Sequence, residues 1–160
     1  MALPGYMKIT AENQGQIEGE CDLDSRDGFV VIQGIQHSVK LPTDNRGLPN
    51  GRRVHLPITV LKEIDRTSPM LYQALSDGEL LTEVIIDWYR LDGAGMEELY
   101  YRQILKNAQI TAIDFVVEHT SDVANNAKGH MEKVSFIYDS IIWSHEVDGI
   151  EYEDNFGATA

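Results

Sequence analysis

The histidines are the side chains of this sequence best suited to metal or acid–base chemistry. A zinc site needs several imidazole, thiolate or carboxylate ligands that converge, and a HExxH motif or two closely spaced histidines commonly announces one. The pair His145-Glu146 is followed by Val-Asp-Gly, with no second ligand. The five histidines stand singly, at His37, His55, His119, His130 and His145. Their spacing predicts no shared metal site, and we expect most of them to be surface or half-buried polar groups.

Other motifs that could carry chemistry are incomplete. Residues 22–28, DLDSRDG, begin like an EF-hand calcium loop, but Arg26 and Asp27 stand where that loop needs an acid or amide and a glycine. Gly93-Ala94-Gly95 lacks the third glycine of a dinucleotide fingerprint, and no serine lies in a G-x-S-x-G elbow. Cys21, the one cysteine, has no motif linking it to a histidine base and reads as a buried, inert thiol. The sequence therefore predicts no enzyme and no cofactor. A hydrolase would need converging groups that it does not announce.

The charge balance and composition narrow the class of protein. Lys and Arg number 13 against 26 Asp and Glu, a formal net charge of -13, whereas nucleic-acid binding relies on clustered basic residues. The hydrophobic fraction of 42% is ordinary for a soluble globular protein. No signal peptide is visible at the amino terminus, and nothing approaches the roughly 20 apolar residues of a membrane span. We expect a single domain over residues 1–160, without nucleic acid and without a membrane span.

Strand-like runs dominate the chain. The one predicted helix begins at Ser68, which can cap the free amide groups, continues with Pro69 at the first helical position and stops at Gly78. It is too short to stand alone, and Gly34 suggests a bulge in a strand. Apolar alternation and β-branched residues mark strands near 6–10, 16–21, 29–41, 56–64, 80–91, 96–106, 109–119 and 131–143. This pattern predicts a mainly β fold, a small antiparallel β-barrel of two packed sheets with one short flanking α-helix.

One connection between strands is unusually long and basic. Residues 42–57 read PTDNRGLPNGRRVHLP, and a loop of this length in a small β domain usually has a contact to make. It carries Arg46, Arg52 and Arg53 against a single acid, Asp44. The loop is therefore a basic island on an acidic protein.

The C-terminal part of the chain has the opposite charge. After Lys133 there is no Lys or Arg, while six acids follow: Asp139, Glu146, Asp148, Glu151, Glu153 and Asp154. Two interpretations stay open, a solvated acidic tail or a surface complementary to the basic loop of another copy.

Aromatic residues suggest an alternative function. Aromatics at strand spacing belong more often to a core or an interface than to a ligand platform. A carbohydrate platform would nevertheless need residues of this kind: Trp88, Tyr89, Tyr100, Tyr101, Tyr138 and Trp143. The alternative is thus a monomeric or dimeric β-barrel module that binds a peptide or a sugar.

Motifs in a fixed order along the whole chain resemble one known family. They are the N-terminal MALPGYMKI, HSVKLP, NGRRVHLPI, LKEIDRTSPMLYQALSDGE, WYR with a turn into EELYYRQILKNAQI, and the closing HMEKVSFIYDSIIWSHEVDGIEYED. Together they resemble the haemolysin-coregulated protein (Hcp) family, the tube protein of bacterial type VI secretion systems. The main departure is residues 118–128, EHTSDVANNAK, where the family often has a Met-Pro-Asn-like turn.

The resemblance implies a subunit of a hexameric ring with a central pore, and rings that stack head to tail into a tube. It implies as partners a spike protein at the tube tip, a contractile sheath and effector proteins held in the pore. It also implies assembly in the bacterial cytoplasm, followed by secretion to the extracellular space or a target cell without a signal peptide. We expect the long loop to contact the next ring through Asp44, Asn45, Arg46, Leu48, Asn50, Arg52 and Arg53.

Overall fold

Strands make up about half of the chain in the computed structural model, which describes residues 3–155. One α-helix and two 3-10 turns, Asp24–Arg26 and Val123–Asn125, lie between them. In chain order the elements are β1 (Gly5–Ala11), β2 (Gly15–Ile17), β3 (Val30–Gln36), β4 (Val39–Lys40), β5 (Val54–His55), β6 (Ile58–Glu63), α1 (Ser68–Asp77), β7 (Leu81–Leu91), β8 (Glu97–Val116), β9 (Met131–Ile137), β10 (Ser140–His145) and β11 (Ile150–Asn155).

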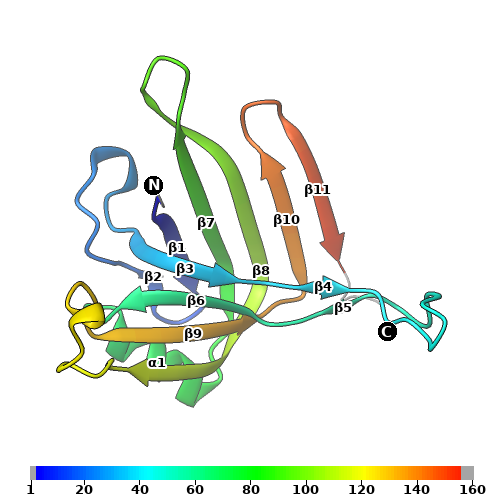
Figure 1. Cartoon of the computed structure of the whole chain (residues 1–160), viewed down its shortest axis with the longest axis horizontal. Coiled ribbons are helices and arrows are strands. Elements are labelled where there is room, and N and C mark those ends of the chain that lie inside the picture. Colours follow the sequence, from blue (N-terminus) through cyan, green and yellow to red (C-terminus); the bar gives the residue numbers. More distant parts are fainter. Residues whose placement is uncertain (1–2, 156–160) are drawn as a thin grey trace.

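Six strands close a ring. Antiparallel pairing runs in the order β8, β7, β1, β3, β6 and β9, and the ring closes because β9 also pairs with β8. β10 and β11 extend from β8 as a two-stranded flap. Figure 1 shows β7, β8, β10 and β11 side by side, with β3, β6 and β9 running crosswise to them. The prediction of a mainly β fold with two packed layers and one short flanking helix is confirmed.

β8 joins the ring to the flap. Its residues 101–106 pair with β10, whereas residues 109–116 pair with β9. Between them Asn107 has a φ of 51°, in the left-handed region that asparagine tolerates better than most residues. The strands predicted at 96–106 and 109–119 are therefore one bent strand. Conversely, the run predicted at 131–143 is two strands, β9 and β10, separated by Tyr138 and Asp139.

The apolar core lies inside the ring. Alternate residues of the ring strands point inward, and Met7, Ile86 and Phe136 are completely buried there. Helix α1 adds Leu71 and Ala74 to the same cluster. Each large apolar side chain buried in this way contributes about 1.5–3 kcal/mol, so the core fixes the ring that carries the flap.

The predicted helix is confirmed, but its start is built differently from the prediction. Gly78 ends the helix with a φ of 62°, as expected. Ser68 is the first helical residue and not the cap, and its hydroxyl donates to Glu132 at 2.8 Å. The carboxylate of Asp65 instead accepts from the amide of Thr67, at 2.9 Å. The Ser68 hydroxyl is thus recruited by a buried carboxylate that lies 64 residues away in the sequence.

That carboxylate belongs to a buried ion cluster. Lys62 and Glu132, opposite each other on β6 and β9, are both completely buried, and the Lys62 ammonium donates to the Glu132 carboxylate. The ammonium also lies 3.1 Å from Asp65 Oδ1 and 3.4 Å from Ser68 Oγ. The cluster ties the start of α1 to the ring.

Three of the six acidic C-terminal residues, Glu151, Glu153 and Asp154, lie in a strand. β11 pairs with β10 at six positions, from Ile150↔His145 to Asn155↔Ser140. Asp154 within it is buried, with 5% of its surface exposed. The interpretation as a solvated tail is therefore wrong at Asp154, because the chain brings a basic partner to it, as described below.

Candidate functional site

The long basic connection is a projecting hairpin, residues 39–55, which we call the arm (Figure 1). β4 and β5 form its base through the pairs Val39↔His55 and Lys40↔Val54, and Thr43 bridges to Pro49 nearer the tip. This two-stranded sheet does not pair with the main sheet. The arm is therefore a separate ordered element rather than a loose loop.

The tip of the arm holds its shape through its own hydrogen bonds. The Asp44 carboxylate accepts from the amides of Arg46, at 2.8 Å, and Leu48, at 3.0 Å. Gly47 and Gly51 have φ values of 78° and 108°, which side chains rarely allow. Asp44 was predicted as a contact residue, and its carboxylate here shapes the turn that presents the others.

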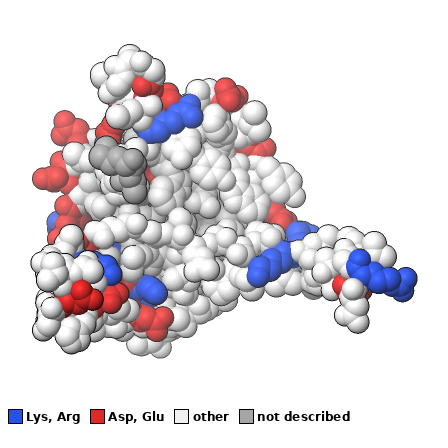
Figure 2. Space-filling view, in the orientation of Figure 1, with Lys and Arg blue, Asp and Glu red and all other residues white. Residues whose placement is uncertain are grey.

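Six of the seven predicted contact residues are exposed on this hairpin, Arg53 among them. Arg46, Asn45, Asn50 and Arg52 are exposed, and Leu48 between them is 55% exposed. No ion pair within residues 3–155 includes Arg46 or Arg52. In Figure 2 the arm carries Lys and Arg, with an acidic group beside them, as it projects to the right, while many of the visible acidic side chains lie toward the left and upper edges of the body. Beyond its base, the arm thus presents Arg46 and Arg52 without an ion pair in the described residues, together with the apolar side chain of Leu48.

Arg53 faces the body of the molecule. Its guanidinium donates two hydrogen bonds to the carboxylate of Asp154 on β11, from Nε to Oδ2 at 2.6 Å and from Nη2 to Oδ1 at 2.5 Å. The hydrogen bonds from Arg53 lower the pKa of Asp154, and a further one from His55 acts in the same direction. The basic loop and the acidic C-terminal region therefore meet here within one chain. Arg53 fixes the base of the arm to β11.

Two of the five histidines join this anchor. His37 Nε2 lies 2.6 Å from the hydroxyl oxygen of Tyr138, and His55 Nδ1 lies 2.8 Å from the same oxygen. His55 Nε2 in turn lies 2.8 Å from Asp154 Oδ2. Both imidazoles stack on Trp143, with centroid distances of 6.4 and 6.3 Å. His37 and His55 stand singly in the sequence and are half-buried as expected, and they meet here because β4 and β5 bring the two ends of the arm together.

Burial governs the electrostatics of this cluster. It lowers the pKa of His37, to which the neighbouring His55 adds, and it raises the pKa of the Tyr138 phenol. A Tyr–His–Asp series could relay protons in an enzyme, but the His55 side chain is only 1% exposed. A substrate therefore cannot reach the imidazole of His55, and the cluster acts as a structural anchor for the arm.

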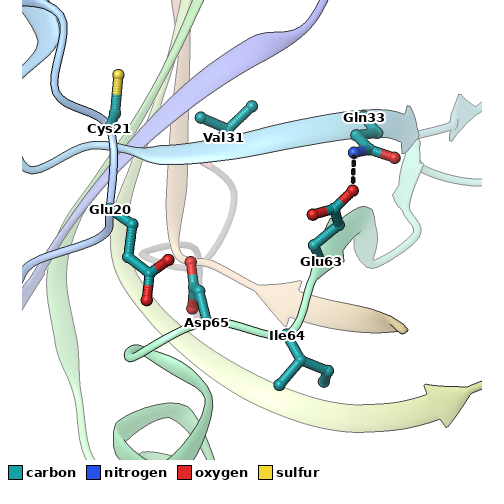
Figure 3. A pocket seen from close by; sticks show the side chains of 7 residues that line it. All are labelled: Glu20, Cys21, Val31, Gln33, Glu63, Ile64 and Asp65. Carbon is teal, nitrogen blue, oxygen red and sulfur yellow. Dashed lines mark hydrogen bonds between the residues drawn. The ribbon is translucent and has the colours of Figure 1, made fainter. Parts of the chain in front are cut away.

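The opposite end of β3 and β6 is hollowed by a pocket of about 250 Å³. Figure 3 shows Gln33 and Glu63 facing each other across it, joined by a hydrogen bond of 2.8 Å, while Cys21 points away from Glu20. Within residues 3–155 no three His, Cys, Asp or Glu side chains come together as metal ligands. The pocket is lined by Glu20, Cys21, Val31, Gln33, Glu63, Ile64 and Asp65.

Known proteins are similar to this chain in both sequence and fold. Residues 6–145 match the family model described as "Type VI secretion system effector, Hcp". The "Major exported protein" of Pseudomonas aeruginosa is 39% identical over 166 residues, which cover 98% of this chain and 96% of that protein.

Solved structures agree. A structure described as "Crystal structure of Hcp protein" has a TM-score of 0.89 at 28% identity, with 96% of this chain and 97% of that one covered. An Hcp1 variant from E. coli EAEC 042 has a TM-score of 0.86 at 29% identity, with 97% and 99% covered. No helix in the described part of the chain is long and apolar enough to cross a bilayer. The sequence match over most of the chain, together with the shared fold, shows that the chain belongs to the Hcp family of the type VI secretion system.

Proposed function

We propose that this chain is a structural subunit of the type VI secretion inner tube. In this role it forms hexameric rings that stack head to tail and carry effector proteins in the central pore. The observation that supports this most is the arm, which presents Arg46 and Arg52 without an acidic partner among residues 3–155, on a chain of net charge -13. A projecting basic element at one end of an acidic subunit suits a heterologous contact, which generates open stacks without a two-fold axis.

The arm supplies the contact between rings in this proposal. Arg46, Arg52 and Leu48 make it, with Asn45 and Asn50 beside them, since their side chains are exposed. Asp44 and Arg53 support it from within the subunit, by shaping the tip and fixing the base. One exposed ion pair is worth only about 0.2–1 kcal/mol, but six arms in a ring act together.

The remaining partners follow from this role. A spike protein caps the tube, a contractile sheath propels it, and effector proteins travel in the pore. The subunit assembles in the bacterial cytoplasm and then leaves the cell with the tube, without a signal peptide. The relative named "Major exported protein" supports export.

Oligomeric state tests the proposal. Light scattering of the purified protein should give six times the 18.0 kDa mass of one chain, and electron microscopy should show rings with a central opening. A monomer or dimer at every concentration, with no ring images, contradicts the proposal. That result would favour the alternative, a β module that binds a peptide or a sugar.

Charge reversal tests the role of the arm. In the double variant Arg46→Glu with Arg52→Glu we expect rings of unchanged size that no longer stack, and loss of secretion. The matched control Arg46→Lys with Arg52→Lys keeps both charges and should stack nearly as well as the parent. Equal stack lengths for the glutamate variant and the parent would show that the arm does not hold rings together.

A further inference from the structure

The pocket beside Glu63, which we call the acidic pocket, lies at the end of the molecule opposite the arm. β3 runs toward the arm and ends at Gln36, and β6 begins there, with Thr59 opposite Gln36. At the other end of the same two strands Lys62 lies opposite Ile32, and Glu63 follows it. In Figure 1 this end lies at the left, where β3 begins, while the arm extends to the right. β3 and β6 therefore separate the pocket from the arm of the same chain.

Acidic side chains gather around this pocket. Residues 18–28 hold five acids, all exposed, and one base, Arg26, which is buried and already paired with Glu97. Glu20 of this loop and Glu63 of β6 line the pocket. Neither of them has a cation partner within residues 3–155. In Figure 2 acidic side chains line the left edge of the body, away from the arm. This end of the subunit thus carries uncompensated negative charge.

The two carboxylates are held in place and still have acceptor oxygens to offer. Glu20 Oε1 accepts from the amide of Arg66 at 3.0 Å, and Glu63 Oε1 accepts from Gln33 Nε2 at 2.8 Å. The Oε2 atoms of both have no hydrogen-bond partner in the described part of the chain. Arg66, which is exposed, brings one cation to this end against seven acids, five in residues 18–28 and the others at positions 63 and 65. A basic partner would therefore meet ordered, available carboxylates.

The pocket also has an apolar part, and its size suits side chains. Val31 and Ile64 in its lining are 37% and 40% exposed. Its volume of about 250 Å³ is below the roughly 300–1,000 Å³ of pockets that hold small molecules. Figure 3 shows Glu20 and Asp65 on one side of it and Glu63 on the other. A hairpin tip with one apolar and two basic side chains matches this lining in chemistry and in size.

We propose that the acidic pocket receives the arm of a second copy of the chain. Leu48 of that arm packs on the apolar part of the pocket, and Arg46 and Arg52 bind the two carboxylates that lack cations. Because arm and pocket lie at opposite ends of the subunit, the contact is heterologous, and each added copy leaves an arm at one end and a pocket at the other. The inference rests on the proposed tube function, since it names the surface that an arm meets in the next ring.

The β7–β8 hairpin is the surface that competes with the pocket for this role. Its tip also exposes an apolar side chain, Met96, which is 67% exposed. The two acids that follow, Glu97 and Glu98, already pair with arginines of the same chain. This tip therefore offers the arm fewer uncompensated carboxylates than the pocket does.

Disulfide trapping tests the contact. Leu48→Cys with Val31→Cys, in a Cys21→Ser background, places one thiol at the arm tip and one in the pocket. The two cannot meet within one chain, because Val31 lies near the start of β3 and the arm follows its end. After mild oxidation we expect a reducible ladder of linked chains on a denaturing gel. The matched control, Leu48→Cys with Met96→Cys in the same background, uses a more exposed position and should give several-fold less ladder.

The same samples are imaged by electron microscopy, so that the contact and the tube function are judged separately. Stacked rings without a ladder from the pocket pair, or a control ladder as strong as the pocket ladder, overturn the arm–pocket contact and leave the tube function standing. A pocket ladder in protein that forms no rings supports the contact and contradicts the tube function. Neither rings nor ladder overturns both.

A charge exchange tests the ion pairs. Glu20→Arg with Glu63→Arg should shorten stacks several-fold, as the arm glutamate variant described above does. The combination of both changes keeps the parental net charge and should recover most of the stack length. In the matched control the arm glutamates are combined with Asp77→Arg and Glu151→Arg, two exposed acids outside the pocket, and stacking should stay lost. Equal stack lengths for the two combinations overturn the ion pairing. The disulfide ladder decides if the pocket arginines prevent folding.

Discussion

Lys62→Met should be among the most damaging single substitutions in this protein, although it exchanges two side chains of similar length. Lys62 is completely buried, and its ammonium donates to Glu132, which is completely buried as well. Methionine retains the apolar stem of lysine, so little burial of apolar surface is lost. What is lost is the cation that compensates a carboxylate in the core.

The structure sets the size of the effect. Without Lys62, the Glu132 carboxylate keeps the hydroxyl of Ser68 at 2.8 Å, while its Oε2 already has no hydrogen-bond partner within the described residues. Leaving one buried charge unpaired costs about 3–5 kcal/mol, a large part of the 5–15 kcal/mol by which a typical domain is stable. Since Asp65 and Ser68 adjoin the same ammonium, α1 should loosen first.

The assay is urea unfolding at one fixed protein concentration, because an oligomer's stability depends on concentration. The companion double variant, Lys62→Met with Glu132→Leu, removes both charges and should recover most of the loss or exceed the parent in stability. Hydrogen exchange should show faster exchange in α1 than in β7 for the single variant. A single-variant loss below about 1 kcal/mol, or a double variant as unstable as the sum of its parts, would refute the reasoning.

Two further substitutions have matched controls, and both are measured by urea midpoints. In Gly19→Ala the new Cβ would lie 2.8 Å from the Phe29 carbonyl carbon and 2.9 Å from Val30 Cα, so we expect a loss of about 1–3 kcal/mol, whereas Gly93→Ala meets nothing within 4 Å and should be neutral or slightly stabilising. Equal midpoints for the two variants would contradict this. Arg26→Lys gives up a planar group held between Tyr6 and Tyr89, at 4.3 and 4.0 Å from their ring centroids, and should cost roughly 1–2 kcal/mol. Arg90 lies over the ring of Tyr100 at 5.0 Å and is more exposed, so Arg90→Lys should cost less than half as much. A larger loss for Arg90→Lys than for Arg26→Lys would contradict the stacking of Arg26 between two tyrosine rings.

Local signals predicted the parts of the fold that depend on neighbours in sequence. The helix ends at Gly78 because its conformation is set within one turn, and Gly34 lies at a register shift between β3 and β6 as its missing side chain suggested. Bends of the long strands escaped prediction. Asn107 bends β8 where the strand changes partner from β10 to β9, and no local pattern of apolar residues marks such a change.

In the candidate site, too, local features were predictable from the sequence and long-range contacts were not. The basic, turn-rich composition of the arm was visible in the sequence, and so was its exposure. The anchor was not, because His37 and Tyr138 are 101 residues apart and His55 and Asp154 are 99 apart. One signal was available: HSVK and RVHLP flank the arm almost symmetrically, and pairing Val39 with His55 brings their histidines to one end.

These long separations also determine the order in which the molecule can fold. β7 and β8 are joined by a short turn, so their hairpin closes a small loop and can form early. The ring of strands can close only after β6 has paired with β9, where Ile58 lies opposite Phe136. The anchor joins partners still farther apart than these and needs β11 already paired with β10, so we expect it to form last. A newly made subunit would therefore complete its core before it fixes its arm, and the element proposed for assembly would become ready only when the rest of the subunit is folded.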